Sequence, residues 1–170
     1  MTVFSYMTSK LYLISLFSIL ISAQTISAQI QNVDSLENVL NRRSSDDKEK
    51  VDLMNEIAYS LFAKDAQKAM EYASKSAQLS DRLNYIKGKA VSMWVTGLVY
   101  IKSDKDTAIK YFQQGLTLAE AIGEQSVICN CLIALGSIQN ELCNIKESDT
   151  IYEKAYTIAI KMDDKSSLLK

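Results

Sequence analysis

Small residues recur along this chain at an interval of 39 positions. One set is Ala58, Gly97 and Gly136, and a second set is Ala69, Ala108 and, displaced by one position, Ser148. Self-similarity at a period of about 20 to 50 residues indicates an array of repeated units, each stacked on its neighbour. The recurrence therefore constrains the fold more than any single motif in the sequence does.

Further registers follow the same interval. Their members are Ala73, Phe112 and Tyr152; Ser76, Gly115 and Ala155; and Leu79, Leu118 and Ile158. Each unit then reaches a residue that tolerates a turn, at Asn84, Gly123 and Asp163. The repeats are thus expected to cover 46–84, 85–123 and 124–163, with the start of a fourth at 164–170.

Each repeat is predicted to contain two helices joined by a tight turn. In the second repeat, apolar residues at helical spacing predict helices over about 86–102 and 106–122, with Asp106 as the N-cap of the second. Asp46 and Asn144, each with Glu three residues later, are the caps expected elsewhere. Small residues such as Gly97 and Ala108 would let the two backbones approach closely. The chain has no proline and five glycines, which favours long helices.

The pattern resembles that of the tetratricopeptide repeat (TPR) family in its longer-repeat variants. In the second repeat, the residues that match this pattern are Met93, Thr96, Gly97, Tyr100, Ala108, Phe112 and Gly115. The third has Leu132, Leu135, Gly136, Ser148, Tyr152 and Ala155, and the first has Met54, Ile57, Ala58, Ala69, Ala73 and Ser76. The resemblance covers about 48–170. It implies an all-α fold, a right-handed α-solenoid of antiparallel helix pairs. Two departures are the repeat length, about 34 residues in the family, and the absent closing proline.

The resemblance also implies a concave groove that binds a protein or peptide and is lined by the first helix of each repeat. The groove positions are Asp52, Asn55, Tyr59 and Phe62; Val91, Trp94, Leu98, Ile101 and Lys102; and Asn130, Ile133, Ser137, Asn140 and Glu141. Apolar anchors among polar groups suit a peptide, because buried aromatics supply most of the binding energy. The alternative is that Trp94 and its neighbours simply pack against adjacent helices.

The N-terminus is typical of a secretory signal peptide. Lys10 precedes the uncharged run LYLISLFSILIS, and a polar segment ending in alanine follows. A bilayer span takes about 20 apolar residues, more than this run offers. Residues 1–28 are therefore expected to be removed after Ala28, with cleavage after Ala23 or a start at Met7 as alternatives. The mature protein would be periplasmic or extracellular. The other interpretation is an apolar helix, buried or anchoring the chain to a membrane.

Composition argues against catalysis and against most cofactors. The chain has no histidine, a net charge of −1 and no cluster of Lys and Arg. It also lacks a glycine-rich phosphate loop and a CxxC pair. We expect no enzyme activity, no cofactor, no metal site and no nucleic-acid partner. Membrane contact would come only through an uncleaved leader or a further C-terminal part. The three cysteines, Cys129, Cys131 and Cys143, are expected to be small core residues.

The two ends of the repeat region leave alternatives open. Within 29–45, Leu36, Val39 and Leu40 form either a short capping helix or part of a linker. At the other end no polar closing helix is evident, so apolar surface around Ile151, Ala155 and Ile158 is expected to be exposed or to be covered by self-association. Together these features predict a binding module, or the sensory fragment of a longer bacterial signalling protein. The alternative is a structural scaffold or dimerisation fragment.

Overall fold

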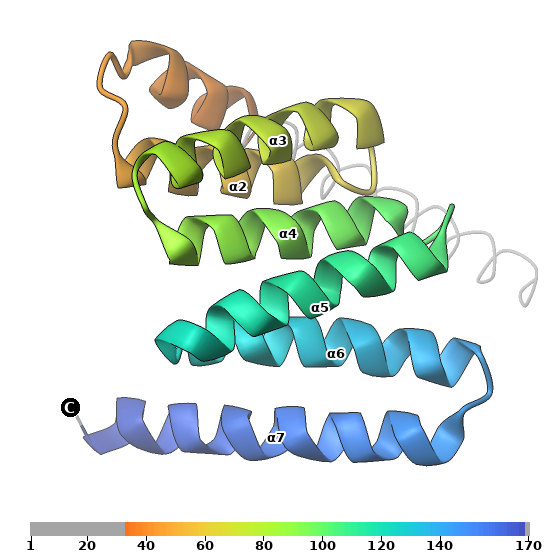
Figure 1. Cartoon of the computed structure of the whole chain (residues 1–170). Helices are drawn as coiled ribbons and strands as arrows, with labels where there is room; N and C mark the ends of the chain where they lie inside the picture. The colour runs from red at the N-terminus through yellow and green to blue at the C-terminus, as the bar shows by residue number, and fades with distance from the viewer. Residues whose placement is uncertain (1–32, 169–170) are drawn as a thin grey trace, which may run out of the picture. The chain divides into compact units, whose positions relative to one another are not determined.

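A computed structural model of the chain describes residues 33–168, and within them the side chains of residues 33–162. The chain divides into two units after Val39. The described part of the first unit begins a short helix over 33–42. The second unit contains the helices labelled α2 to α7 in Figure 1. The predicted leader, residues 1–28, lies outside the described residues.

Every regular element between residues 33 and 168 is a helix, which confirms the all-α prediction. The helices of the second unit are α2 (Lys48–Leu61), α3 (Ala66–Arg82), α4 (Ile86–Tyr100), α5 (Lys105–Ile122), α6 (Gln125–Glu141) and α7 (Ile145–Leu168). Each packs against the next along the chain, and α4 also contacts both α2 and α6 (Figure 1). The alternate helices α2, α4 and α6 are therefore neighbours in space.

The helices α2, α3 and α5 each have an aspartate as their N-cap. For α2 and α5, the sequence predicted a nearby aspartate instead of the one that caps the helix. Asp104 caps α5 by accepting a hydrogen bond from the backbone N–H of Thr107, so Asp106 lies inside the helix. Asp47 caps α2 through the N–H of Lys50 at 2.8 Å, while Asp46 forms an ion pair with the Lys50 side chain. Adjacent aspartates have the same capping chemistry, so sequence alone does not separate them.

Where α4 and α5 cross, Gly97 of α4 packs against the aromatic ring of Phe112 from α5. A Cβ placed on Gly97 would lie 2.5 Å from the nearest ring carbon of Phe112, a residue with no exposed surface. Similarly, a Cβ placed on Gly136 would lie 2.9 Å from the nearest ring carbon of Tyr152. Ala108 is fully buried as expected, but the group that requires a glycine at position 97 is Phe112 rather than Ala108.

The last helix does not end where the sequence predicted a turn. α7 continues through Asp163 and Asp164 to Leu168, so no new helix begins at 164. The two earlier turns each contain a residue with positive φ, Asn84 at 49° and Gly123 at 68°. Asparagine and glycine tolerate that conformation well, whereas the segment MDDKSS contains neither. Nothing in that segment favours breaking the helix.

The apolar surface of α7 also differs from the prediction. Ala155 is only 3% exposed, and Ile151 and Ile158 pack against the cluster formed by α5 and α6. The exposed large apolar side chains of α7 instead include Tyr156, at 69%, Ile145, at 52%, and Ile160, at 43%. The exposed side of α7 is therefore rotated by about one-quarter turn from the predicted side, because α6 covers the side that carries Ala155.

A short helix over 33–42 precedes α2. Leu40 packs against a cluster of buried residues that contains Val51, Met54 and Leu79. The first helix pair therefore has an additional apolar contact at its N-terminal side.

The cysteines are free and differ in burial. Cys131 is fully buried in the cluster between α5 and α6, and Cys129 is half-buried. Both fit the expectation of small core residues. Cys143 does not, because it is exposed in the turn before α7 with φ of 60°.

Candidate functional site

Three predicted groove residues form a stack of aromatic rings on α2 and α4. The Tyr59 ring lies 5.1 Å from the Trp94 ring at an interplanar angle of 25°, and 5.5 Å from the Phe62 ring at 23°. These centroid distances are typical of favourable aromatic pairs. Tyr59 is 47% exposed, so its ring is both held in place and open to solvent.

An apolar pocket of about 270 Å³ adjoins this stack where α2 and α4 end. Its lining residues are Phe62, Ala63, Ala66, Leu98, Val99, Ile101, Lys102 and Ser103. Four of them, Phe62, Leu98, Ile101 and Lys102, were predicted as groove residues. Of the other four, Ala63 and Ser103 lie in the turns after α2 and α4, Ala66 begins α3 and Val99 lies inside α4. None of the four is a groove position in the pattern that the resemblance implies. Phe62 belongs to both the stack and the pocket, so the two form one continuous surface.

Trp94 has a structural role as well. Its half-buried side chain packs against three separate clusters of buried residues, around Cys131, Phe112 and Val95. Val91 likewise packs against two of these clusters. These contacts favour the alternative interpretation, in which Trp94 and Val91 pack against adjacent helices. Trp94 presents a face to Tyr59 while most of its contacts belong to the core.

Asn55 and Asp52 are occupied by contacts within the protein. Asn55 is 3% exposed, and its Nδ2 donates a hydrogen bond to the Gly88 carbonyl at 2.9 Å, while its Oδ1 is buried without a partner. The Asp52 carboxylate accepts a hydrogen bond from the Tyr85 hydroxyl at 3.1 Å. Burial, reinforced by the Asp52 charge, raises the pKa of Tyr85 to about 12, so its hydroxyl stays protonated. Both contacts join α2 to the start of α4.

The third-repeat positions lie on α6 and contribute no ring to the aromatic stack. Ile133 is 48% exposed, Asn130 and Asn140 are exposed, and Ser137 is half-buried. Glu141 forms an ion pair with Lys105 at 2.8 Å. None of these α6 residues lines the pocket beside Phe62. The candidate site is therefore concentrated on α2 and α4.

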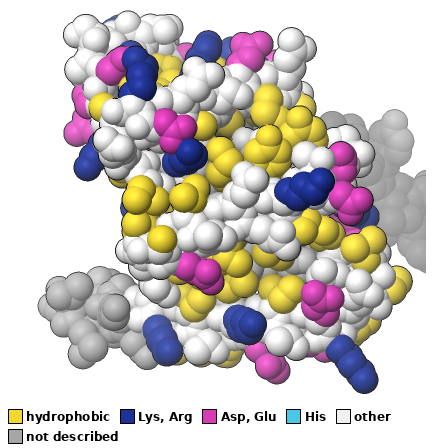
Figure 2. Space-filling model, viewed as in Figure 1, with side chains coloured by type: hydrophobic (Ala, Val, Ile, Leu, Met, Phe, Trp, Pro, Cys, Tyr) yellow, Lys and Arg dark blue, Asp and Glu magenta, His cyan; other side chains and the backbone are white. Residues whose placement is uncertain are grey.

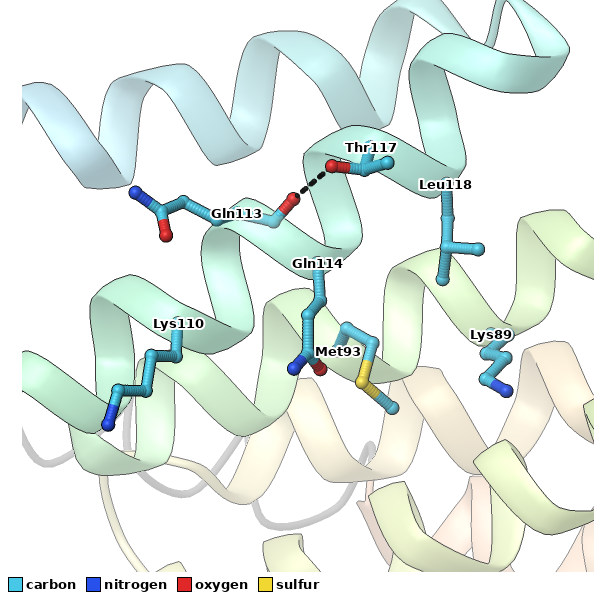
Figure 3. Close-up of a pocket in the computed structure, with 7 residues that line it drawn as sticks. All are labelled: Lys89, Met93, Lys110, Gln113, Gln114, Thr117 and Leu118. Carbon is cyan, nitrogen blue, oxygen red and sulfur yellow. Dashed lines mark hydrogen bonds between the residues drawn. The ribbon is translucent and has the colours of Figure 1, made fainter.

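A larger pocket, about 480 Å³, lies between α4 and α5 (Figure 3). Met93 and Leu118 form its apolar part, and Lys89 and Lys110 lie at its two ends. Its polar rim consists of long flexible side chains, and Lys89 already pairs with Asp81 at 2.6 Å. We favour the smaller pocket as the candidate site, because rigid rings that need no reordering bind at lower entropic cost.

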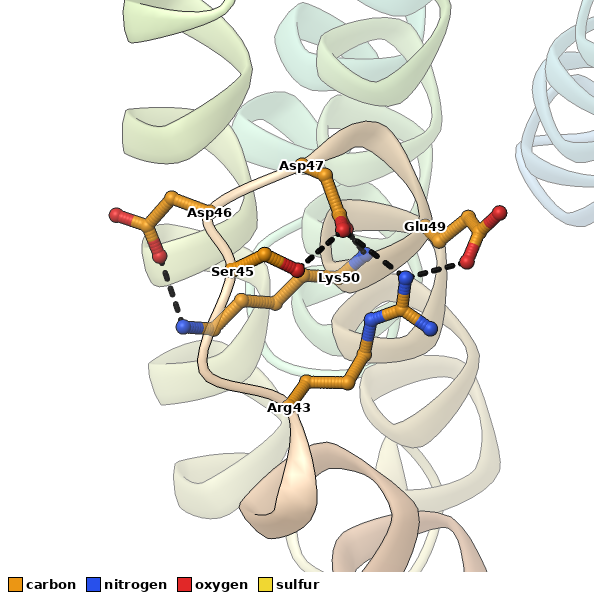
Figure 4. Close-up of polar contacts among 6 residues, drawn as sticks. All are labelled: Arg43, Ser45, Asp46, Asp47, Glu49 and Lys50. Carbon is orange, nitrogen blue, oxygen red and sulfur yellow. Dashed lines mark hydrogen bonds and ion pairs between the residues drawn. The ribbon is translucent and has the colours of Figure 1, made fainter.

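A charged cluster precedes α2 (Figure 4), and its role is to fix the helix start. Arg43 pairs with Asp47 at 3.0 Å and also contacts Glu49. Hydrogen bonds to Asp47 from the Ser45 hydroxyl, the Arg43 guanidinium and the Lys50 N–H lower the pKa of its carboxyl to about 2. The Asp47 carboxylate therefore accepts from three donors that hold the start of α2 in place.

Charged side chains are otherwise scattered. Figure 2 shows one face of the molecule, on which hydrophobic patches alternate with single charges of either sign. Among the side chains that the structure describes, residues 33–162, no three from His, Cys, Asp or Glu lie close enough to hold a metal ion. No described helix combines the length and apolar character needed to cross a membrane. In comparisons with known proteins, no family model matches the chain and no curated protein matches it.

Proposed function

We propose that this chain is a non-catalytic module that binds a protein or peptide, built as a right-handed α-solenoid of about three TPR-like repeats. The contacts of α4 with both α2 and α6 support this arrangement, since stacked repeats place their first helices side by side. The shared packing of Gly97 on Phe112 and of Gly136 on Tyr152 supports the equivalence of the last two repeats. With no histidine in the sequence, the most common general base is absent.

The observation that carries the proposal is the half-exposed ring of Tyr59, stacked between Phe62 and Trp94 beside an apolar pocket. A ring fixed on both sides loses little conformational entropy when a ligand covers it. The pocket of about 270 Å³ has room for an apolar side chain. A peptide bound here would bury the exposed Tyr59 face and insert an apolar residue beside Leu98 and Ile101.

Peptide selection followed by matched tyrosine variants tests this function. Peptides would be selected from a random library on the mature chain, and their affinities measured for the parent, Tyr59→Ala and Tyr111→Ala. Tyr111 is the control because it is also a tyrosine stacked on an aromatic ring, that of Tyr100 at 5.8 Å, but does not belong to the candidate site. We expect Tyr59→Ala to weaken binding about tenfold or more, as for an aromatic hot spot. Equal affinities for all three proteins would refute the site.

We also propose that the protein acts outside the cytoplasm, after removal of residues 1–28, as the sensory part of a longer signalling protein. The support is the charged and apolar pattern of the leader and the resemblance of the repeats to such sensory regions. Mass spectrometry of protein made in a secreting host tests the first part. We expect Gln29 at the mature N-terminus, or Gln24 for the alternative cut. An intact Met1 or Met7 would exclude cleavage.

A second candidate function is a structural scaffold or dimerisation fragment that has no ligand of its own. The exposed Tyr156 and Ile160 on α7 favour it, because exposed apolar side chains that lie together often mark an interface. Sedimentation of the chain over a range of concentrations separates the two functions. Self-association combined with a failure to select any Tyr59-dependent peptide would favour the scaffold.

A further inference from the structure

The larger pocket, which we call the α4–α5 pocket, has a counterpart one repeat earlier. That counterpart has a volume of about 460 Å³ and lies between α2 and α3. Residues that line the two pockets occupy equivalent positions of the repeat. The equivalent pairs are Lys50 and Lys89, Met54 and Met93, Lys75 and Gln114, Gln78 and Thr117, and Leu79 and Leu118. The two helices of a repeat therefore form the same pocket twice.

Ion pairs occupy the earlier pocket. Asp46 pairs with Lys50 at 2.8 Å and with Arg82 at 3.2 Å, and all three residues line it. One repeat before Lys110, at the end of the α4–α5 pocket, the chain has the acidic residue Glu71. The charges of the earlier pocket thus already have partners, and the cation at one end of the later pocket has no equivalent there.

The middle of the α4–α5 pocket is apolar (Figure 3). Met93 and Leu118 line it, and the Thr117 hydroxyl donates a hydrogen bond within α5 at 2.9 Å. Lys89 pairs with Asp81 at 2.6 Å, so its charge is compensated and its methylene stem adds to the apolar lining. This part of the pocket therefore suits an apolar chain.

The opposite end of the α4–α5 pocket carries an uncompensated charge. Lys110 is exposed there, and within residues 33–162 it forms no ion pair. Asp104 acts on it electrostatically, but that carboxylate already accepts hydrogen bonds from the backbone N–H and the hydroxyl of Thr107. Gln114 follows one turn later on α5, and its amide can donate a hydrogen bond. A carboxylate bound here would receive an ion pair and a hydrogen bond.

The shape of the pocket favours an elongated ligand. Lys110 and Leu118 are two turns apart on α5, about 12 Å along the helix axis. A further pocket of about 240 Å³ shares Lys89 and Leu118 with the first and continues to Ile86, which is 43% exposed. The volume of the α4–α5 pocket, about 480 Å³, lies within the range of small-molecule sites, about 300–1,000 Å³.

We propose that the α4–α5 pocket binds a small amphiphilic carboxylate. The ligand is an unbranched monocarboxylic acid of about ten carbons, whose zigzag of C–C bonds of about 1.5 Å matches the spacing of Lys110 and Leu118. Its carboxylate pairs with Lys110 beside Gln114, and its chain lies over Met93 and Leu118. None of these residues belongs to the Tyr59 site, so the proposal does not depend on the proposed peptide binding.

Nuclear magnetic resonance of the methionine methyl groups tests where such acids bind. The full-length chain would be isotope-labelled at these methyl groups and titrated with hexanoate, octanoate and decanoate, with signals assigned from Met93→Leu and Met54→Leu. We expect the Met93 signal to shift and saturate, while Met54, its equivalent in the earlier pocket, stays in place. Affinity should rise about two- to fourfold for each added methylene, because each buries further apolar surface.

A charge variant tests the carboxylate. Octanoate should bind the parent about two- to fivefold tighter than the neutral alcohol of the same length, the range expected for one exposed ion pair. Lys110→Glu, which introduces the residue type of Glu71, should abolish this preference. Lys154→Glu, at an exposed position on α7, is the matched control and should keep it. Circular dichroism melts confirm that both variants are folded.

Several outcomes overturn the proposal. One is a Met93 signal that does not saturate up to about 5 mM decanoate. Equal shifts of Met54 and Met93 would show unspecific association with apolar surface. An affinity that does not depend on chain length would exclude the apolar part of the site. Octanol bound as tightly as octanoate, or a carboxylate preference that persists in Lys110→Glu, would exclude the charged part.

Discussion

The ring of Phe112 lies directly over the backbone of Gly97, where any side chain on residue 97 would overlap it. Three ring carbons lie at 2.5, 2.7 and 2.9 Å from the position that a Cβ would take. Contacts this short require a shift, and the ring is fully buried with no room to move freely. The glycine therefore sets how closely α4 and α5 approach.

Gly97→Leu should lower the free energy of unfolding by about 1–3 kcal/mol, the usual cost of overpacking a close contact. Glu120→Leu, at an exposed position on α5, should change it by less than about 0.5 kcal/mol. Urea denaturation of both variants measures the difference.

A double-mutant cycle with Phe112 shows whether the ring is responsible. Phe112→Ala removes the ring, so adding Gly97→Ala to it should cost less than Gly97→Ala alone. If the two effects are additive within about 0.5 kcal/mol, the two residues do not interact as described.

Trp94→Ala should be far more destabilising than Tyr59→Ala. Trp94 packs against three buried clusters, and removal of a large core aromatic costs about 3–5 kcal/mol. Tyr59 is 47% exposed and loses mainly its two ring contacts, worth about 0.5–1.5 kcal/mol each. The same urea denaturation measures both. Similar losses for the two variants would mean that Tyr59 is a core residue and that the candidate site is misplaced.

The sequence predicted which positions are buried better than it predicted what covers them. Ala69, Ala108 and Ser148, found only by their interval, are all at most 1% exposed. The repeat period fixes the face of a helix on which such residues lie. It does not fix the neighbour on that face, so Trp94 was assigned to a groove although most of its contacts belong to the core. The same limit explains the misplaced apolar surface of α7.

Local chemistry limited the prediction of helix ends. Neighbouring aspartates at 46 and 47, or at 104 and 106, have equal capping ability, and the choice depends on the turn that precedes the helix. Pocket residues such as Ala63 and Val99 carried no signal, because small and aliphatic residues are common everywhere in such a chain. Tyr59 and Phe62 were identified because they fall on the groove positions that the resemblance implies.

Asp47→Asn should make the free energy of unfolding depend less on pH between about pH 4 and pH 2. The Asp47 carboxyl has a pKa of about 2 in the folded chain, against about 3.9 for an ordinary aspartate. A depressed pKa contributes stability that is present above about pH 4 and is lost as the pH falls through about 2. Asparagine can still accept the Lys50 N–H but carries no charge for Arg43.

The variant should therefore be less stable than the parent at neutral pH, and the difference should shrink towards pH 2. Urea midpoints at a series of pH values measure it. The carboxyl pKa values of Asp46 and Asp104 are also lowered. Both residues are present in the parent and in the variant, so their effects on stability cancel in the comparison. A difference that stays constant down to pH 2 would show that the Asp47 charge contributes nothing to folding.

The three cysteines should react with iodoacetamide in the order of their burial. Burial raises the pKa of Cys131 to about 12, and only the thiolate is nucleophilic. Relative to an ordinary thiol with a pKa of about 8.5, the thiolate fraction at pH 8 falls by more than about a thousandfold. Cys143 is exposed and should be alkylated first, and half-buried Cys129 should follow.

Peptide mapping by mass spectrometry at successive times gives the order. In the native chain, Cys131 should be alkylated only as fast as the protein opens, and in urea all three cysteines should react at similar rates. Alkylation of Cys131 as fast as Cys143 under native conditions would show that α6 does not stay packed against α5.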